Sequence, residues 1–342
     1  MKDIRKLGLE ELKTIVSELG EKPFRAKQIY EWIWQKSAVS FDQMTNLSVK
    51  TRELLKDSLT FNPITVKDKQ KSADGTIKYA FQLFDGHVVE GVLIPTDTRI
   101  TACVSSQVGC SLTCKFCATG YMKRERNLDA AEIYDQVVHI MRDSEELFGR
   151  PLTNIVYMGM GEPLLNYKNM LFSTQLISSD KGLNFSNKRI TVSTAGIAKM
   201  IDKLAEDQVK FNLALSLHAA NDLKRNQIMP INEGNSLDAL AASLNNFCRV
   251  TKQKVTFEYI VFAGFNDDIV DADELIKFSS RVPCKINIIE YNPIEFADFQ
   301  NASEDKLDLF LNHLEKKGLN VNVRRSRGKD IDAACGQLAI KN

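Results

Sequence analysis

The sequence predicts an α/β protein in which an open, partial barrel of six βα units follows a small helical module. After residue 99, six short apolar runs alternate with longer segments that carry helical patterns. The first 75 residues show helical periodicity instead. The chain has 342 residues, 44% of them apolar, which is enough to bury one large core and a smaller one.

Residues 1–75 form the first predicted unit, a helical accessory domain. Apolar residues between Leu7 and Leu19 follow a helical stripe, and further helices are expected over residues 29–34 and near 48–57.

Residues 76–98 are then expected to form a β-hairpin extension. Its first strand alternates apolar and polar residues from Tyr79 to Leu83, and the turn Asp85-Gly86 leads into a second apolar run.

The third predicted unit spans residues 99–342. Its strands are expected at Thr101–Ser105, Asn154–Met158, Arg189–Ser193, Asn212–Leu217, Thr256–Val261 and Ile286–Tyr291, with helices such as Ala130–Phe148 and Leu237–Val250 between them. Six units are too few to close an eight-stranded barrel, so an open barrel is predicted, with a doubly wound sheet as the alternative. In either fold the chemistry is expected at the C-terminal ends of the strands.

Composition narrows the class of protein. No apolar stretch reaches the roughly 18 residues of a membrane helix, and the N-terminus lacks a signal-peptide pattern, so a cytoplasmic protein without a membrane partner is expected. Four of the seven cysteines, at positions 103, 110, 114 and 117, are crowded together. In a reducing compartment this favours metal binding or redox catalysis over a disulfide framework.

The strongest motif is the spacing CxxxCxxC of Cys110, Cys114 and Cys117, on a loop after the first barrel strand. A [4Fe–4S] cluster normally takes four cysteines, so three thiolates leave one iron open to another ligand. Zinc is the alternative, because Cys103 would complete four ligands. However, zinc sites usually pair CxxC with a second CxxC or with histidines, and neither pattern occurs here.

This cysteine motif resembles the signature of the radical S-adenosylmethionine (SAM) superfamily, whose fold is the partial barrel predicted above. The resemblance implies a [4Fe–4S] cluster whose open iron chelates the methionine amine and carboxylate of SAM. An electron from the cluster then cleaves the sulfonium to give a 5′-deoxyadenosyl radical. The cofactor therefore carries out the radical chemistry, and the protein orients it. A low-potential electron donor such as flavodoxin or ferredoxin is an expected partner.

Polar residues at successive strand ends are the candidates for binding SAM. A lone Ser or His at a strand end is usually structural, but several of them downstream of a cluster motif favour a cofactor site. Glycines in the segment from Gly159 to Pro163 allow close backbone approach, and its carboxylate suits an ammonium group. The candidate SAM contacts are Gly161, Glu162, Ser193, Ser216, Leu217, His218 and Asn292.

A narrower resemblance covers the chain from about residue 75 to its end. The segments 103–110, 158–164 and 327–338, together with Glu258-Tyr259, resemble the RlmN group of adenosine C2 methyltransferases. Such an enzyme needs unusual chemistry, because carbon 2 of adenine has no lone pair with which to displace a methyl group from SAM. The helical first 75 residues also suit this group.

The RlmN resemblance implies roles for three further residues and two SAM molecules per turnover. One SAM methylates the Cys335 thiolate, and the radical from the second removes hydrogen from that methyl group. The carbon radical adds to the adenine, Glu90 removes the ring proton, and Cys103 attacks the sulfur of Cys335 to release the product. Without the resemblance, the two thiols would be assigned to the core and Glu90 to a solvent-facing strand position. Cys248 and Cys284 are expected to be core thiols.

RNA is the expected substrate, and two basic runs flank the proposed site. They are Lys123-Arg124-Glu125-Arg126 after the cluster loop, and Arg324 to Lys329 before Cys335. The resemblance implies 23S rRNA and tRNA as the targets.

Three aromatic residues in the helical module have two possible roles. At the spacing of Tyr30, Trp32 and Trp34 they are more often core residues, with base stacking as the alternative. Two other functions stay open: an adenine C8 methyltransferase with the same mechanism, and a non-catalytic zinc-containing RNA-binding protein.

Overall fold

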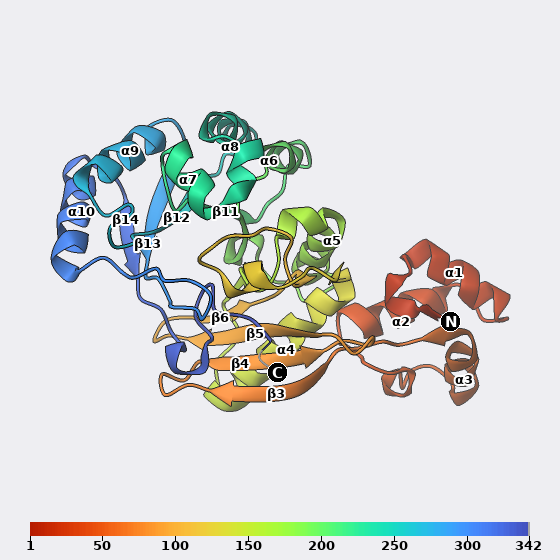
Figure 1. Cartoon of the computed structure of the whole chain (residues 1–342). Helices are drawn as coiled ribbons and strands as arrows, with labels where there is room; N and C mark the ends of the chain where they lie inside the picture. Colours follow the sequence, from red (N-terminus) through yellow and green to blue (C-terminus); the bar gives the residue numbers. More distant parts are fainter. Residues whose placement is uncertain (341–342) are drawn as a thin grey trace.

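The computed structural model describes residues 1–340 and is built on a ten-stranded sheet with the order β14-β13-β12-β11-β10-β9-β6-β5-β4-β3 (Figure 1). The strands from β6 to β14 in this sheet pair in parallel. Their bounds are β6 (Ile100–Cys103), β9 (Asn154–Tyr157), β10 (Ile190–Thr194), β11 (Asn212–Ser216), β12 (Val255–Ile260), β13 (Cys284–Ile289) and β14 (Val321–Arg324). The predicted partial barrel is therefore confirmed, and each of the six expected strands lies within two residues of its predicted bounds.

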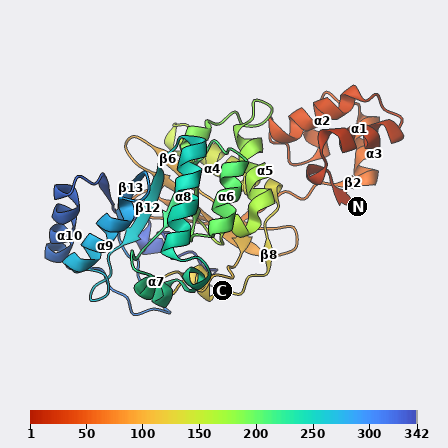
Figure 2. The ribbon, with the colours of Figure 1, turned by 90° about the horizontal axis from the view of Figure 1, so that it is seen from above.

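Helices connect the parallel strands, and α6 and α8 lie side by side against the sheet (Figure 2). The helices are α4 (Ala130–Phe148), α5 (Tyr167–Ser178), α6 (Ala198–Glu206), α7 (Asp222–Ile228), α8 (Leu237–Thr251), α9 (Ile269–Ser279) and α10 (Glu304–Lys316). The expected helix over residues 130–148 is confirmed at both ends. None of the helices in residues 1–340 is long and apolar enough to span a membrane.

Three antiparallel strands extend the sheet beyond β6 and correct the predicted boundary at residue 75. They are β3 (Thr65–Lys71), β4 (Ile77–Gln82) and β5 (Val88–Pro95), and β5 pairs with β6. Residues 65–71 therefore belong to the sheet and not to the helical module. The sequence TVKDKQK hides this strand because it is charged and almost fully exposed, as is common for an edge strand that must avoid pairing with other chains.

The N-terminal helical module is smaller than expected and ends with α3. It contains α1 (Leu9–Glu18), α2 (Phe24–Trp34) and α3 (Val49–Ser58), and a short parallel pair, β1 (Lys2–Asp3) and β2 (Leu59–Thr60). Figure 1 shows the module beside the barrel. Trp34 is buried and packs edge-on against Tyr134 of α4, with ring centroids 5.1 Å apart. The core role favoured for this tryptophan is confirmed.

A buried ion pair joins this module to α4. Arg5 Nη1 lies 2.5 Å from Asp135 Oδ2, and the same carboxylate oxygen accepts a hydrogen bond from the backbone N–H of Ile64 at 3.1 Å. Tyr134 donates a hydrogen bond to the carbonyl oxygen of Trp34 at 2.7 Å. Because these partners are far apart in sequence and buried, they fix how the helical module sits on the barrel.

We expect Arg5→Ala to lower the free energy of unfolding by about 3–5 kcal/mol, because it leaves the Asp135 carboxylate buried without its partner. Urea unfolding followed by circular dichroism measures the change. Lys2→Ala is the control, because Lys2 forms only an exposed ion pair with Glu11. Equal unfolding midpoints for the two variants would contradict the anchoring role of Arg5.

Candidate functional site

The inner face of the parallel sheet is polar, although parallel sheets usually carry apolar residues on both faces. Successive side chains of a strand point to opposite faces, and the apolar ones pack in the core beneath the helices. On the other face, neighbouring strands place polar side chains in register. Ser216 stands beside Glu258, which stands beside Asn287. Asn287 Nδ2 donates to Glu258 Oε1 at 2.9 Å. A polar interior of this kind is suited to a ligand.

The three motif cysteines lie on the loop between β7 (Gln107–Val108) and the 3-10 turn η3 (Ala118–Tyr121). Burial raises the pKa of Cys114, and the charges of Cys117 and Cys110 raise it further, so the three thiols face one another. The backbone N–H of Leu112 donates to Cys110 Sγ at 3.4 Å. A positively charged centre would favour the deprotonated thiolates in such a buried group.

Zinc and an iron–sulfur cluster differ in how closely their thiolate ligands must converge. Zinc holds its sulfur ligands about 2.3 Å from one ion. Within residues 1–340, no three His, Cys, Asp or Glu side chains converge closely enough to hold one metal ion. In a [4Fe–4S] cluster, by contrast, each thiolate binds its own iron, so the thiolates stand further apart. Cys103, the fourth ligand that zinc would require, ends β6 and does not lie on the loop that carries the three motif cysteines.

Gly161 and Glu162 hold the ends of β9 and β10 together. Gly161 has a φ of +94°, and a Cβ atom there would lie 2.5 Å from the Cβ atom of Gln107, so only glycine fits. Glu162 is buried, and its two carboxylate oxygens accept hydrogen bonds from the backbone N–H groups of Leu164 at 3.0 Å and Ala195 at 2.7 Å. The side chain of Thr194 also forms a hydrogen bond with this carboxylate, so part of its acceptor capacity remains for a ligand.

The next candidates line up along the ends of β10 and β11. Ser193 Oγ and Ser216 Oγ are 3.5 Å apart on neighbouring strands. Leu217 is fully buried. His218 has a φ of +55°, and its Nδ1 accepts a hydrogen bond from the backbone N–H of Ile260 at 3.2 Å. Burial, and then the charge of Arg225, lower the pKa of His218 to about 3, so this histidine is neutral at physiological pH.

Asn292 connects the end of the barrel to the segment that carries Cys335. Its Nδ2 donates to the carbonyl oxygen of Cys335 at 3.1 Å. Its Oδ1 is buried without a hydrogen-bond partner within the described chain. A buried acceptor without a partner is costly, so this atom fits a ligand donor such as a ribose hydroxyl.

Arg225 of α7 is a site residue that the sequence did not reveal. Its buried guanidinium donates to the carbonyl oxygens of Ala195 at 2.5 Å, Ser216 at 3.0 Å and Leu217 at 3.1 Å. It thereby fixes the same strand ends that carry the SAM candidates. Burial lowers the pKa of Arg225 to about 10. No motif identifies this arginine, because its partners are the backbone carbonyl groups of other elements and the side chain of Asn232.

Cys103 and Cys335 differ in exposure. Cys103 ends β6 and is buried, which raises its pKa to about 12, with a further contribution from Cys335. Cys335 follows the turn η7 (Lys329–Ile331) and is exposed to solvent. Surrounding protein atoms nevertheless raise its pKa to about 11, with a further contribution from Cys117. Water reaches the Cys335 thiol although protein atoms surround it, so the thiol lies in an open recess beside the cluster loop.

Arg324, expected to contact RNA, also pairs with a carboxylate of the sheet and acts on the charge of these thiols. Its charge lowers the pKa values of Cys103 and Cys335, and its Nη1 lies 3.5 Å from Glu258 Oε1. Other members of the basic runs are also engaged. Arg126 pairs with Glu132 at 2.8 Å and with Asp85 at 2.5 Å, and Lys329 pairs with Glu290 at 2.6 Å. Lys123 and Arg124 are exposed and remain candidates for phosphate contacts.

Glu90 lies on β5 with its side chain buried, which corrects the solvent-facing position that its strand pattern alone suggested. Lys78 Nζ of β4 lies 3.5 Å from Glu90 Oε1, whereas Oε2 has no hydrogen-bond partner within residues 1–340. Burial raises the pKa of Glu90. Lys78 lowers it in part, and Asp332 of the C-terminal segment raises it slightly. This buried carboxylate has the properties of a general base.

We expect Lys78→Met to shift the rising limb of the pH–activity profile to higher pH. The family resemblance implies that Glu90 is a base. A base works as the carboxylate, so in that role activity should rise as the pH passes the pKa of Glu90. Removing the lysine leaves burial and Asp332 to raise that pKa, so less carboxylate remains at neutral pH. Single-turnover methylation measured across pH tests this, and Lys78→Arg should keep the parental profile. Superimposable profiles for the parent and Lys78→Met would contradict the pairing.

The two remaining cysteines take no part in this arrangement. The thiol of Cys248 on α8 is buried and donates to the carbonyl oxygen of Pro283 at 3.7 Å. The thiol of Cys284 on β13 is half-buried and donates to that of Ser279 at 3.7 Å. Both pack against the main core, in agreement with the expectation of core thiols.

Comparison with known proteins finds a family match for the helical module and another for the barrel. Residues 2–60 match a family described as the ribosomal RNA large subunit methyltransferase N-terminal domain, and residues 104–276 match the radical SAM superfamily. A probable dual-specificity RNA methyltransferase RlmN from Cytophaga hutchinsonii is 64% identical over 99% of this chain and 93% of its own length. The dual-specificity RNA methyltransferase RlmN from Geobacter sulfurreducens is 43% identical, over 100% and 93% of the two chains.

A solved structure shares the whole fold. The crystal structure of a radical SAM methyltransferase from Sphaerobacter thermophilus superposes with a TM-score of 0.93 at 40% sequence identity, covering 99% of each chain. The likeness therefore includes the helical module and the C-terminal segment as well as the barrel.

Proposed function

The chain belongs to the RlmN family of radical SAM methyltransferases, and from this premise we propose that it methylates C2 of adenosine in 23S rRNA and tRNA through an S-methylcysteine on Cys335. The observation that carries the proposal is the place of Cys335. This exposed thiol precedes Gly336, whose carbonyl oxygen accepts a hydrogen bond from the backbone N–H of Ala118 on the cluster loop, and its charge raises the pKa of the buried thiol Cys103. A zinc-binding RNA protein without catalysis has no use for such a pair.

The residues proposed to hold the cluster and SAM lie on the cysteine loop and at the neighbouring strand ends. Cys110, Cys114 and Cys117 would hold the [4Fe–4S] cluster. Gly161, Glu162, Ser193, Ser216, Leu217, His218 and Asn292 would surround SAM at the strand ends, with the buried Oδ1 of Asn292 available to a SAM donor. When bound, the cluster and SAM supply a 5′-deoxyadenosyl radical that abstracts hydrogen. A low-potential donor such as flavodoxin or ferredoxin would provide the electron.

Cys335 is the methyl carrier. Its thiolate first displaces a methyl group from one SAM molecule, and solvent access at the recess allows SAM to reach it. Arg324 favours this thiolate by lowering its pKa. After a hydrogen atom has been removed from the S-methyl group, the carbon adds to C2 of an adenine that has left its stack. The adduct then joins Cys335 to the RNA through a methylene bridge.

Glu90 and Cys103 complete the reaction. The adduct radical would return one electron to the oxidised cluster and lose its C2 proton, which the unpartnered Oε2 of Glu90 would accept. The Cys103 thiolate then attacks the sulfur of Cys335. An S–S bond forms, the carbon–sulfur bond breaks, and the released carbon takes up a proton to become the methyl group. Cellular thiol reductants must reopen the disulfide, which suits the cytoplasm, where we expect both RNA classes to be modified.

Isotope labelling tests this sequence of steps. With SAM that carries a CD3 methyl group, we expect 5′-deoxyadenosine to gain one deuterium and the methylated adenosine to carry CD2H. Mass spectrometry of both products, after one turnover with unlabelled and labelled SAM, measures this. A product that keeps all three deuterium atoms would mean direct methyl transfer and would overturn the S-methylcysteine route.

A further inference from the structure

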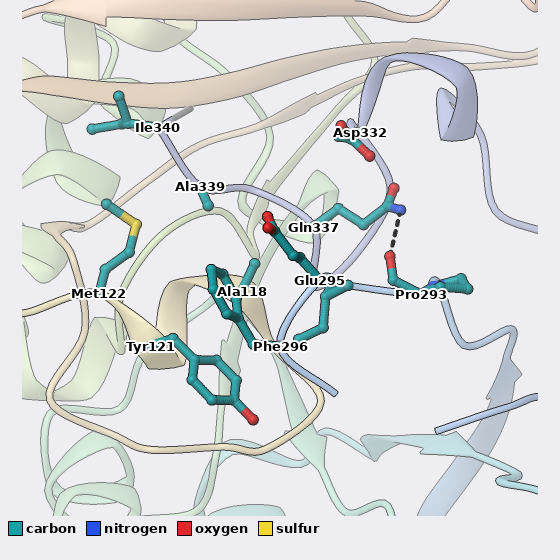
Figure 3. Close-up of a pocket in the computed structure, with 11 residues that line it drawn as sticks. Ala118, Tyr121, Met122, Pro293, Glu295, Phe296, Asp332, Gln337, Ala339 and Ile340 are labelled. Atoms are coloured by element: carbon teal, nitrogen blue, oxygen red, sulfur yellow. Dashed lines mark hydrogen bonds between the residues drawn. The ribbon is translucent and has the colours of Figure 1, made fainter. Parts of the chain in front are cut away.

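A cavity of about 430 Å³ lies beside the proposed reaction centre without including it (Figure 3). Three segments form its wall: the η3 turn with Ala118, Tyr121 and Met122, the loop from Pro293 to Phe296, and the C-terminal segment with Asp332, Gln337, Ala339 and Ile340. The lining contains none of the cysteines, and neither Glu90 nor any candidate SAM contact. Its volume is in the range of pockets that hold small organic groups.

Two exposed aromatic rings stand in this cavity wall. Tyr121 is 47% exposed and Phe296 is 56% exposed, although both are large apolar side chains. Their ring centroids are 5.2 Å apart and the ring planes are 29° from parallel, so they stack on each other. A hydrogen bond from the Tyr121 hydroxyl to the carbonyl oxygen of Lys115, at 3.0 Å, fixes the tyrosine. The pair is therefore a preformed aromatic platform that offers its outer surface to solvent.

Hydrogen bonds connect this platform rigidly to Cys335. The backbone N–H of Ala118 donates to the carbonyl oxygen of Gly336 at 2.7 Å, and Thr119 Oγ1 donates to that of Leu338 at 2.6 Å. Gln337 Nε2 donates to the carbonyl oxygen of Pro293 at 3.1 Å, which Figure 3 shows as the dashed line. The cluster loop, the Phe296 loop and the segment that carries Cys335 therefore form one framework.

The charges near the platform indicate a nucleobase and not a phosphate group. Glu295 lines the cavity with a carboxylate, which repels phosphate but can accept a hydrogen bond from the amino group of a base. The exposed cations Lys123 and Arg124 follow Tyr121 closely along the chain, outside the lining, where a nucleic acid backbone would pass. Single-stranded RNA is commonly recognised by bases that stack on aromatic side chains next to such cations.

We propose that the Tyr121–Phe296 platform binds a nucleobase that flanks the target adenosine, so that the RNA is held beside the reacting base as well as at it. The occupant is a flanking base, because the residues assigned to the chemistry lie next to the cavity and not in it. This inference rests on the proposed RNA methylation. It adds a second recognition site, which positions the target for Cys335.

RNA binding by the full chain tests the platform. With a tRNA transcript as the probe, Phe296→Ala should weaken binding roughly five- to a hundredfold, the range that stacking of one base gives. Phe296→Tyr should bind like the parent, because it keeps the ring. Leu309→Ala is the matched control, since Leu309 is an exposed apolar residue on α10 outside the cavity. Methylation of Cys335 by SAM without RNA should be unchanged in all three variants, which shows that the protein is folded.

Abasic substitutions identify the base. We expect one abasic nucleotide next to the target to weaken binding to the parent, but not to add to the loss caused by Phe296→Ala. Two results would overturn the platform while RNA methylation by the parent stands. One is equal affinity for tRNA in Phe296→Ala and Leu309→Ala. The other is a loss from each abasic nucleotide that adds to the loss from Phe296→Ala at every flanking position. A parent chain that neither binds nor methylates tRNA or 23S rRNA would overturn the proposed function and this inference together.

Discussion

A Cys103→Ala variant is expected to accumulate a covalent protein–RNA adduct in place of methylated RNA. Cys335 stays intact in this variant, so it still accepts a methyl group and still forms the bond to C2. The adduct persists because the thiol that should attack the Cys335 sulfur is gone. Cys103 is suited to that role because it is buried and the charge of Cys335 raises its pKa.

Denaturing electrophoresis with labelled tRNA measures this adduct directly. We expect one shifted protein–RNA band with Cys103→Ala and none with the parent. Cys248→Ala is the matched control, because Cys248 is also a buried thiol but lies on α8, away from Cys335. Normal turnover by Cys103→Ala without a trapped band would contradict the resolving role.

Cys335→Ala is expected to lose the reaction entirely. Without the carrier thiol, no methyl group is loaded onto the protein, no adduct forms and no methylated adenosine appears. The cluster should remain, because its three ligands lie on a different loop. Intact-protein mass spectrometry after incubation with SAM should show one added methyl group in the parent and none in the variant.

A double variant separates the two thiol roles. Cys103→Ala with Cys335→Ala should form no adduct, since the thiol that would be joined to the RNA is missing. Cys284→Ala should load methyl and turn over like the parent, because Cys284 packs against the core. Methylated adenosine made by Cys335→Ala would show that the methyl group reaches the base without this carrier.

The barrel could be predicted because its strands are short apolar runs separated by helical patterns, which local sequence shows. Two edge strands could not. β3 has the sequence TVKDKQK and is charged and almost fully exposed, whereas β14 has the sequence VNVR, which is mostly exposed and too short for its alternation to be distinctive. An edge strand needs no apolar alternation, because it buries little surface, so periodicity cannot reveal it.

Some residues of the proposed site could likewise be predicted from the sequence, and others could not. The cysteine motif and the strand-end residues could be named because spacing and chain order are local properties. Lys78, Arg225 and Arg324 could not, because each acts through contacts between distant parts of the chain. Arg324 shows the limit most clearly: its basic run suggested phosphate binding, and nothing in that run indicated that the side chain also pairs with Glu258 of β12.

The most direct test of adenosine C2 methylation is nucleoside analysis of RNA. The purified, anaerobically reconstituted protein should be incubated with SAM, a reductant and either 23S rRNA or tRNA that lacks the modification. The RNA is then digested and its nucleosides are separated against synthetic standards. We predict 2-methyladenosine in both RNAs. Enzyme-dependent 8-methyladenosine without 2-methyladenosine would contradict the C2 assignment while leaving the radical mechanism in place, and the absence of any methylated adenosine would contradict the proposed function as a whole.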